Sequence, residues 1–336
     1  MSDDDALANL RRGGKAALAR ALAQIEEAPE DEATLALLDA AWAAPRAAVV
    51  GLTGPPGVGK STLLSALVRS WRAQGRTVGV IAVDPSSRRT GGALLGDRTR
   101  IDVDPEDQGV FVRSMAARDR LGGLADLCAA AMVLMRALFD IVLIETVGVG
   151  QSETEVTELA DTVVFAVQPG SGDSLQFMKA GIVEVPDVAL VTKADLGAIA
   201  ERAKRDLEGA LGIGPATEGW QAPVLLVSAT TGQGIDGTLG AIERHRAFLA
   251  PERGVRRAAQ DEAWLARWVR EEFGRRGAKS LGPGPLGGAG SPFRRMARLG
   301  TAGPDLGTSG WPLLARHPRR RLPRDASVFV SSPILH

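Results

Sequence analysis

The sequence predicts an α/β protein built on a doubly wound, mostly parallel β-sheet, and three observations support this class. From about residue 46 to residue 250, apolar runs alternate with segments of helical periodicity. Most of the runs are near-continuous Val, Ile and Leu without polar alternation, which is typical of strands covered on both faces. The first run leads through a glycine-rich stretch into a helical pattern, so we expect parallel strands joined by right-handed helical crossovers.

An N-terminal helical arm, residues 1–45, is expected before the sheet. Apolar residues recur at helical spacing in two stretches within residues 5–43. Pro29 separates the two stretches and Pro45 ends the second. We expect the arm to lie on the domain that follows it.

Residues 46–250 form the main domain, and each apolar run in it predicts a strand. Helical patterns follow many of the runs, including Ser61–Trp71 and Leu124–Leu138. Ligands of such sheets bind at the carboxyl ends of the strands, so the residues just after each run are the candidate site. The predicted strands are Ala47–Leu52, Val78–Val83, Val110–Val112, Ile141–Ile144, Val163–Val167, Val188–Val191 and Val224–Val227.

Residues 251–276 are predicted to form a C-terminal helix, which is amphipathic over 254–276. The remaining residues, 277–336, are rich in Gly, Pro and Arg and show no sustained apolar periodicity. Such a segment is poorly suited to burying a core, so we expect a poorly ordered tail. A natural divergence and a change of reading frame both explain this composition.

Composition excludes several classes of protein. The formal net charge is +0, so no overall field draws the chain to nucleic acid or to a membrane, and we expect neither as a partner. The one cysteine, Cys128, excludes an internal disulfide and is expected in the core. No apolar run is long enough to span a bilayer, and the acidic N-terminus is unlike a signal or transit peptide. We therefore expect a cytoplasmic protein.

The most informative segment reads Gly-Pro-Pro-Gly-Val-Gly-Lys-Ser-Thr and fits the phosphate-loop pattern G-x-x-x-x-G-K-[ST]. Between a strand and a helix, such a loop surrounds a phosphate with backbone N–H groups and a helix N-terminus. Lys60 is expected to reach the β- and γ-phosphates, and the Ser61 hydroxyl to bind Mg²⁺. The predicted phosphate-binding residues are Gly54, Pro55, Pro56, Gly57, Val58, Gly59, Lys60, Ser61 and Thr62.

Acidic residues after two later strands predict a magnesium and catalytic centre. Glu145 ends an apolar strand, and Gly148 follows three residues on. In phosphate-loop NTPases, this acid lies near Mg²⁺ or the attacking water, and the glycine N–H senses the γ-phosphate. Asp84 and Asp97 add two carboxylates of the kind that Mg²⁺ binds beside several waters, although a turn residue and a surface charge are their ordinary alternatives. The predicted metal ligands are Ser61, Asp84, Asp97 and Glu145, and the predicted catalytic residues are Lys60 and Glu145.

Two further strand ends predict the choice of base. Thr192-Lys193-Ala194-Asp195 resembles the guanine motif [NT]KxD, in which the Asp accepts both the N1 and N2 hydrogens of guanine. Lys193 would lay its stem over the base, and a backbone N–H of Ser228-Ala229 would donate to guanine O6. This pattern favours GTP over ATP. Because Thr192 replaces the usual Asn and has one hydroxyl, we expect it to make only part of the amide's contacts and to weaken affinity.

On these motifs, the chain resembles the MeaB/ArgK family, the GTPase chaperones of adenosylcobalamin-dependent acyl-CoA mutases such as methylmalonyl-CoA mutase. The resemblance covers about residues 10–275. Its most specific stretch is Glu145–Glu153, because ordinary Ras-like GTPases carry Asp-x-x-Gly there. The other matching stretches are Thr53–Thr62, Val83–Ser87, Asp97–Arg100, Arg113–Ala116, Leu121–Leu124, Gln168–Lys179 and Lys193–Asp195.

The resemblance implies a P-loop G domain of the signal-recognition/MinD/BioD class that binds GTP or GDP with Mg²⁺. It implies a GTPase that gates adenosylcobalamin loading and protection of a mutase, with Gln168–Lys179 as a mobile switch segment. A cobalamin adenosyltransferase is a further candidate partner. Family members form homodimers through a C-terminal helical region, which residues 277–336 do not resemble. Intrinsic turnover should be slow, because no arginine finger is evident in the sequence.

Three other functions remain open on the sequence alone. An ATP-dependent kinase or ATPase linked to amino-acid transport, an older description of this family, would prefer ATP, which Asp195 opposes. A nickel-delivery GTPase would need clustered Cys and His ligands, whereas Cys128, His245, His317 and His336 are widely separated. A scaffold that binds GTP without hydrolysing it would use the same loops.

Overall fold

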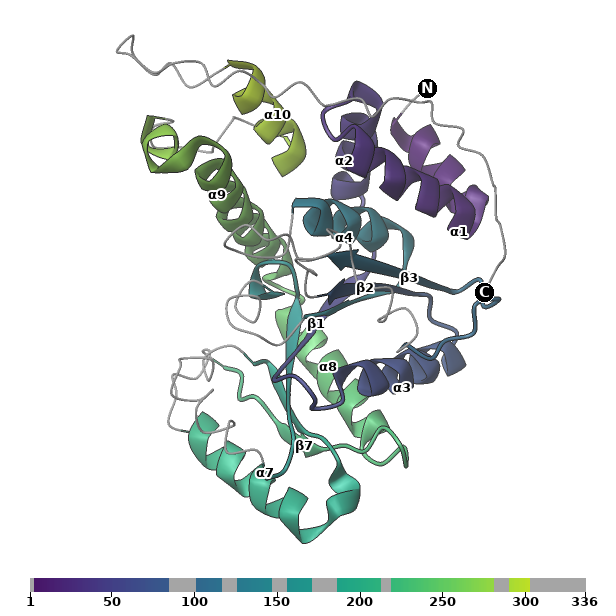
Figure 1. Ribbon diagram of the computed structural model, residues 1–336, viewed down its shortest axis with the longest axis vertical. Coiled ribbons are helices and arrows are strands. Elements are labelled where there is room, and N and C mark those ends of the chain that lie inside the picture. The colour runs from purple at the N-terminus through teal and green to yellow at the C-terminus, as the bar shows by residue number, and fades with distance from the viewer. Residues whose placement is uncertain are drawn as a thin grey trace, which may run out of the picture.

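The structure of the 336-residue chain is a computed structural model that describes residues 3–84, 101–116, 126–146, 156–170, 186–212, 219–280 and 290–302. Seven strands form one sheet in the order β3-β2-β4-β1-β5-β6-β7, and each neighbouring pair is parallel (Figure 1). The predicted doubly wound parallel sheet is confirmed. The strands are β1 (Ala48–Thr53), β2 (Val78–Asp84), β3 (Val110–Ala116), β4 (Ile141–Glu145), β5 (Thr162–Val167), β6 (Val188–Val191) and β7 (Val224–Leu226).

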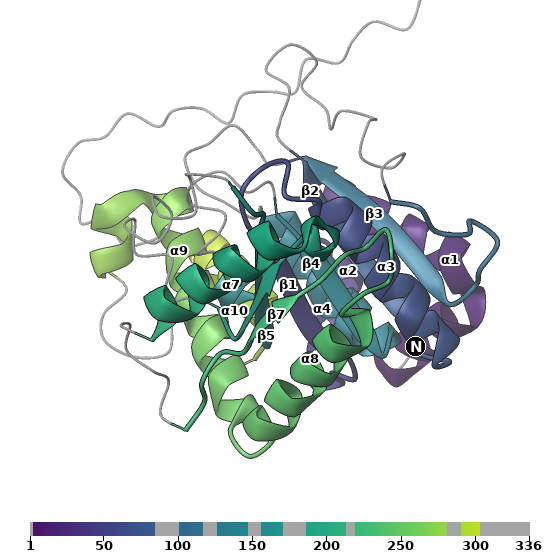
Figure 2. The same cartoon turned by 90° about the horizontal axis from the view of Figure 1, so that it is seen from below.

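Helices cover both faces of the sheet, as Figures 1 and 2 show from two directions. Alternate strand residues pack against α4 and α7 on one face and against α3 and α8 on the other. This two-sided burial explains why the strands lack polar alternation. The helices are α1 (Asp3–Glu27), α2 (Glu32–Ala43), α3 (Lys60–Ala73), α4 (Asp126–Leu138), α7 (Ala198–Leu211), α8 (Ile235–Leu249), α9 (Arg253–Ser280) and α10 (Pro292–Ala302), with 3₁₀ turns η1 (Val156–Glu158) and η3 (Ala194–Leu196).

The N-terminal arm packs on the outer side of α4 (Figure 1). The chain breaks between α1 and α2 near Pro29, as the sequence predicts. Asp31 caps α2, because its side chain accepts a hydrogen bond of 3.1 Å from the Ala33 N–H. Leu22 and Leu38 are fully buried in the shared core and fix the arm to α4.

The expectation of a poorly ordered tail is wrong for the first part of residues 277–336, because α10 packs between α2 and α9. Phe293 is 3 % exposed, and its ring lies 5.1 Å from that of Trp264. Arg295 donates two hydrogen bonds, of 2.6 and 2.9 Å, to the carboxylate of Glu262. The apolar pattern of α10 covers few turns within a Gly- and Pro-rich context, so periodicity did not reveal it. Residues 303–336 lie outside the described residues.

None of the described helices combines the length and the apolar character that crossing a bilayer demands.

Candidate functional site

The parallel sheet brings the predicted site segments to one edge. Strands β4, β1, β5, β6 and β7 are consecutive neighbours, so their carboxyl ends lie side by side. The segments that follow them begin at Thr146, Gly54, Gln168, Thr192 and Val227. This edge is where ligands of doubly wound sheets bind.

The loop 54–59 joins β1 to the N-terminus of α3, as predicted. Gly54 has φ 140°, and an added Cβ would lie 2.0 Å from the carbonyl oxygen of Ala166 on β5. Only glycine allows the loop to lie this close to the sheet. Gly59, with φ 92°, is the N-cap of α3, and an added Cβ there would meet no atom within 4 Å. One side of the loop is therefore packed on β5, and the α3 end is open toward an incoming group.

Lys60 lies inside the loop that precedes it and is only 7 % exposed. Its Nζ donates to the carbonyl oxygens of Gly54 at 2.6 Å and Pro55 at 3.0 Å. These neutral oxygens offset part of the cost of burying the ammonium group. Within the loop, the positive charge of this ammonium group suits a phosphate.

Ser61 and Glu145 come together across the β1–β4 pair. The Ser61 hydroxyl donates to Oε1 of Glu145 at 2.8 Å, and the Glu145 side chain is largely buried. A hydroxyl and a carboxylate in contact are hard oxygen ligands of the kind that Mg²⁺ accepts beside several waters. The residues present therefore fit the predicted cation.

Of the other two predicted metal ligands, the structure describes the backbone of Asp84 and not Asp97. The backbone of Asp84 ends β2, two residues beyond Ala82, which is the register partner of Glu145. Asp84 thus ends its strand at the same edge of the sheet as Glu145. Asp97 and Gly148 lie outside the described residues. Among the residues that the structure describes, no group of three or more His, Cys, Asp and Glu is arranged to hold a metal ion.

Two threonines that the sequence reasoning missed hold β4 against β1 beside Glu145. Thr146 Oγ1 donates to Thr53 Oγ1 at 2.8 Å, and the Thr146 N–H donates to the Leu52 carbonyl at 3.1 Å. Both side chains are buried. The sequence gives one signal for this pair: Thr53 ends one apolar run, and Thr146 directly follows another.

Thr192 has a different role from the expected base contact. Its hydroxyl lies 2.8 Å from the Val58 carbonyl and 3.0 Å from the Val167 carbonyl, and the residue is buried. The hydroxyl thus connects β6 to the phosphate loop and to β5. The difference arises because Thr192 is still level with the sheet, and the exposed part of the motif begins only at the next residue, Lys193.

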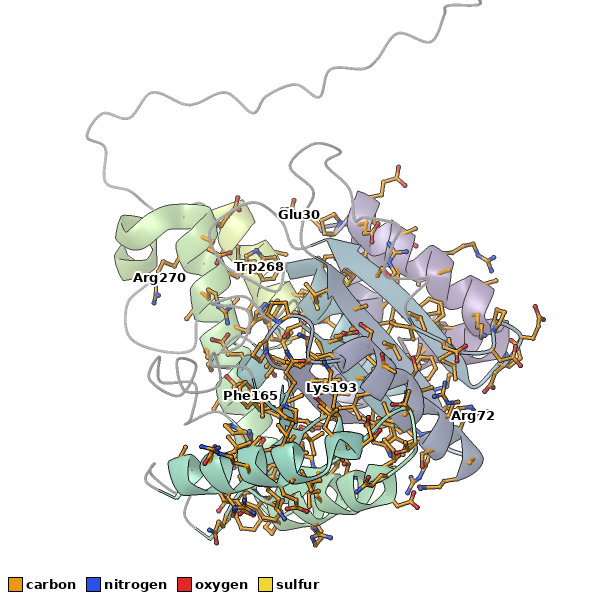
Figure 3. All side chains as sticks on the ribbon, turned by 60° about the horizontal axis from the view of Figure 1, so that its bottom comes forward. Glu30, Arg72, Phe165, Lys193, Trp268 and Arg270 are labelled. Carbon is orange, nitrogen blue, oxygen red and sulfur yellow. The ribbon has the colours of Figure 1, made fainter. Side chains whose placement is uncertain are left out.

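Lys193 and Asp195 lie at the exposed end of this motif. In the view of Figure 3, Lys193 is labelled near the middle of the picture, whereas Trp268 and Arg270 lie on α9 to one side. Lys193 has a left-handed backbone, with φ 54° and ψ 45°, and its Nζ donates to Gln168 Oε1 at 2.5 Å. The Ser228 hydroxyl, more than the nearby Lys193 charge, lowers the pKa of the exposed Asp195 carboxyl. Asp195 therefore stays ionised as a double acceptor.

Ser228 and Ala229 lie in the segment that follows β7, the strand next to β6. The Ser228 N–H donates to the Gln233 carbonyl at 2.9 Å, and its side chain is buried. Ala229 is partly buried against the core beneath it. Of the two predicted N–H donors, the one on Ser228 is thus engaged within its own loop.

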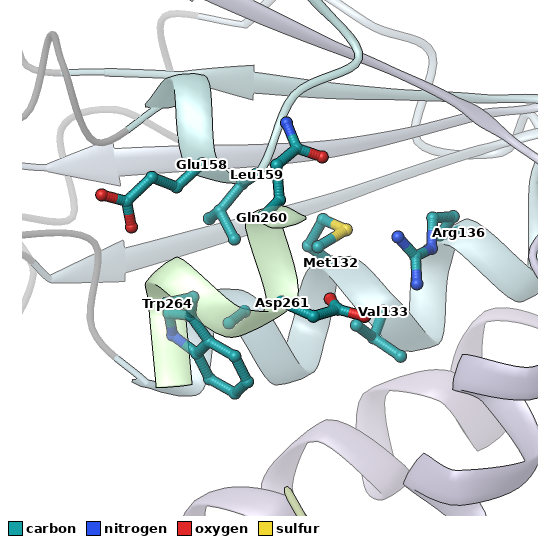
Figure 4. Close-up of a pocket in the computed structure, with 9 residues that line it drawn as sticks. Met132, Val133, Arg136, Glu158, Leu159, Gln260, Asp261 and Trp264 are labelled. Carbon is teal, nitrogen blue, oxygen red and sulfur yellow. The ribbon is translucent and has the colours of Figure 1, made fainter. Parts of the chain in front are cut away.

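A separate small cavity lies away from this edge, between α4, η1 and α9 (Figure 4). Its volume is about 10 Å³, which is room for one water molecule and not for a nucleotide. Arg136 lines it, is 4 % exposed, and has no hydrogen-bond partner for Nε within the described part of the chain. Burial lowers the pKa of Arg136 to about 10.

Comparison with known proteins gives a consistent result. The family model described as "Methylmalonyl Co-A mutase-associated GTPase MeaB" matches residues 18–280. The protein named GTPase ArgK of Escherichia coli (strain K12) is 36% identical over 277 residues, covering 80% of this chain and 84% of that protein. A Mus musculus protein named "Methylmalonic aciduria type A homolog, mitochondrial" is 37% identical over 228 residues, covering 66% of this chain and 55% of that protein.

The fold is also similar to a solved structure. The crystal structure of a protein named "LAO/AO transport system kinase" superposes with a TM-score of 0.65 at 29% sequence identity, covering 83% of this chain and 89% of that one. The match includes most of the residues that the present structure describes.

Proposed function

The chain belongs to the MeaB family of GTPases, and on this premise we propose that its GTP cycle controls a cobalamin-dependent acyl-CoA mutase. In this proposal, GTP with Mg²⁺ binds at the carboxyl edge of the sheet and is slowly hydrolysed. The nucleotide state gates the loading of adenosylcobalamin into the mutase and its protection there. The family description and the name of the mouse relative support a link to methylmalonyl-CoA metabolism.

The observation that carries the hydrolytic part is the contact between Ser61 and Glu145 beside the buried Lys60. We assign Lys60 to the charge of the β- and γ-phosphates and Ser61 to a bound Mg²⁺. Bound Mg²⁺ would neutralise charge that develops on the phosphate oxygens. Glu145 would accept a hydrogen bond from the attacking water and hold it in line with the γ-phosphorus. Such catalysis depends on positioning and on charge stabilisation.

We assign base recognition to the strand ends of β6 and β7. Asp195 would accept the N1 and N2 hydrogens of guanine, a pattern that the edge of adenine does not offer. Because the Ser228 N–H is engaged with Gln233, we assign the donor to guanine O6 to Ala229. Lys193 would cover one face of the base with its aliphatic stem.

The partner is proposed as an adenosylcobalamin-dependent mutase, with a cobalamin adenosyltransferase as a second candidate. The segment Gln168–Lys179, proposed as the switch that relays nucleotide state, lies mostly outside the described residues. A pull-down of purified mutase by this chain tests the partner. Binding that differs between GDP and a non-hydrolysable GTP analogue is expected, and equal or absent binding in both states would contradict it.

The variant Glu145→Gln tests the catalytic assignment. It keeps the side-chain length and one oxygen acceptor but removes the negative charge that orients water and cation. We expect GTP turnover to fall by about 10²-fold while GDP affinity changes only a few-fold. Thr146→Ser, which keeps the neighbouring hydroxyl, should leave turnover nearly unchanged. Unchanged turnover in Glu145→Gln would remove Glu145 from catalysis.

An ATP-dependent kinase or ATPase linked to amino-acid transport is the second candidate. The superposed crystal structure favours it, because that protein is named a transport system kinase. This candidate predicts tighter binding of ATP than of GTP, against the acceptor pattern of Asp195. Competition between the two nucleotides for one site therefore separates the candidates.

A further inference from the structure

Gln168, which no guanine motif includes, contacts the lysine of the guanine motif. Val167 and Val191 are register partners at the ends of β5 and β6, so Gln168 and Lys193 follow adjacent strand ends. The Lys193 ammonium donates to the Gln168 side-chain carbonyl at 2.5 Å. Lys193 itself is exposed, and Gln168 is half-buried. The ammonium end of the exposed Lys193 side chain is thus held by Gln168, whose place is set by the pairing of β5 with β6.

The base of the Lys193 side chain is fixed as well. Lys193 is the one non-glycine residue with a positive φ among the described residues. A left-handed backbone at a non-glycine residue is strained and persists where surrounding bonds impose it. Here the Ala194 N–H donates to the Val227 carbonyl at 3.1 Å, and the Leu196 N–H donates to the Lys193 carbonyl at 3.0 Å. The direction in which the lysine stem leaves the backbone is therefore set by η3 and by Val227, which directly follows β7.

We propose that Gln168 is a positioning residue for guanine recognition, which holds the Lys193 stem as a preordered platform for one face of the base. This inference rests on the proposed function. A free lysine side chain has many rotamers, and ordering it during binding would weaken affinity. Fixing both ends before the nucleotide arrives removes most of that loss.

The chemistry of the glutamine side chain suits this role. Its carbonyl accepts from an ammonium group without adding a second negative charge beside Asp195. The Lys193 charge is one of the influences that lower the pKa of Asp195, so an uncompensated lysine also helps to keep the base acceptor ionised. The pair thus connects the platform under the base with the acceptor at its edge.

A double-mutant cycle on the full chain tests the pair, with GDP and inorganic pyrophosphate as calorimetric probes. Gln168→Ala should weaken GDP binding about three- to tenfold, from the cost of ordering one long side chain. Gln168→Glu keeps the acceptor but places a negative charge beside Asp195, so its GDP affinity should lie between those of Gln168→Ala and the parent chain. Lys193→Met keeps most of the stem without the ammonium, so adding Gln168→Ala to it should have no further effect.

Pyrophosphate separates a base platform from a general change in the site. It contacts only the phosphate loop, so its affinity should be the same in all four members of the cycle. Equal losses for GDP and pyrophosphate in Gln168→Ala, or an undiminished loss in the Lys193→Met background, would overturn the proposal. Gln168→Asn, whose amide is one methylene shorter, should behave like Gln168→Ala and provides a second test if the alanine variant folds poorly. A parent chain that fails to bind GDP would contradict the proposed function itself, whereas normal GDP binding by Gln168→Ala would contradict only this inference.

Discussion

Two regions of the molecule bury charged side chains in different ways. At the sheet edge, the partners of Lys60 include two carbonyl oxygens, and those of Glu145 include a hydroxyl. Along the inner side of α9, which we call the α9 seam, charges meet opposite charges. Arg257 donates from Nε and Nη2 to the two carboxylate oxygens of Asp161 at 2.8 and 2.6 Å, and Arg267 forms an ion pair with Glu158.

The difference shows that a buried charge does not by itself mark a functional site. A hydrogen bond to a carbonyl or hydroxyl can be exchanged for one to a phosphate or a hydrated cation at little cost. A bidentate ion pair cannot be exchanged in this way, because separating its two side chains leaves an uncompensated charge in the interior. We therefore interpret the sheet edge as the ligand site and the α9 seam as structural support.

The largest expected effect is at the seam, for Asp161→Asn. Asp161 is buried, and its Oδ2 also accepts from the Val49 N–H at 2.9 Å. Removing its charge leaves Arg257 unpaired in the interior, so the free energy of unfolding should fall by about 3–5 kcal/mol. Urea denaturation measures this loss, and GDP affinity of the folded variant should change by less than about twofold.

Acid should have a related effect on the parent chain through the same residue. Burial alone would raise the pKa of Asp161, but the Arg257 hydrogen bond and charge outweigh it and leave that pKa below its ordinary 3.8. The stabilisation is therefore complete above about pH 4 and is lost as the pH falls through the folded-state pKa. A stability loss in Asp161→Asn of under about 1 kcal/mol at pH 7 would contradict a structural role for the seam.

The next effect is at the edge, for Lys60→Ala. Removing the charge that we assign to the transferred phosphoryl group should lower GTP turnover by about 10²–10³-fold. The cost to folding should be smaller than that of Asp161→Asn, because the two buried carbonyls that lose their donor are neutral groups. Turnover assays and thermal unfolding of the same samples measure the two effects separately.

Arg69→Ala is the matched control for Lys60→Ala. Arg69 lies on the same helix, and its ion pair with Asp102, at 3.0 Å, is exposed. Such pairs contribute little, so both activity and stability should remain near those of the parent chain. A Lys60→Ala variant as active as Arg69→Ala would break the assignment of the edge.

A smaller change in affinity is expected for Asp195→Asn. Asparagine offers one donor and one acceptor, which match xanthine in place of guanine at the base edge. GDP affinity should fall by about 10- to 100-fold while affinity for xanthosine diphosphate rises. Calorimetric titration with both nucleotides measures this change in base preference. An equal loss of affinity for GDP and for xanthosine diphosphate would indicate damage to the loop instead.

The smallest expected effect concerns the dependence of stability on pH at Asp261, which lies on α9. Burial raises the pKa of Asp261, although the Trp42 N–H donates to it at 2.7 Å. The folded state then binds this proton more tightly than the unfolded state, so stability should decrease as the pH rises from about 4 through the folded-state pKa. Asp261→Asn should flatten this slope in melting temperatures measured across that range. An identical slope in both proteins would contradict the assignment.

The sequence predicts those parts of the molecule whose signals are local. Each strand is a continuous apolar run, and the phosphate loop with Lys60 and Ser61 is one unbroken stretch. Parallel topology then brings Glu145 to Ser61, although 84 positions separate them. The expected parallel sheet is enough to predict that Glu145 and Ser61 lie at the same edge, although not their hydrogen bond.

Pairings that depend on the packing of distant helices were not predictable. Arg257 meets Asp161 across 96 positions, and Trp42 meets Asp261 across 219, with no pattern in either segment to connect them. The contact of Gln168 with Lys193 depends on a left-handed backbone at Lys193, which residue type does not indicate. Thr192 was assigned to the base because a motif places a residue at a strand end but does not show where its side chain points.

Whether the sheet edge is a guanine-nucleotide site is tested most simply by calorimetric titration of the full chain with GTP and with ATP in the presence of Mg²⁺. We expect one site, at least tenfold tighter binding of GTP than of ATP, and loss of that binding in Lys60→Ala but not in Arg69→Ala. Equal or tighter binding of ATP, or GTP binding that persists in Lys60→Ala, would contradict this assignment.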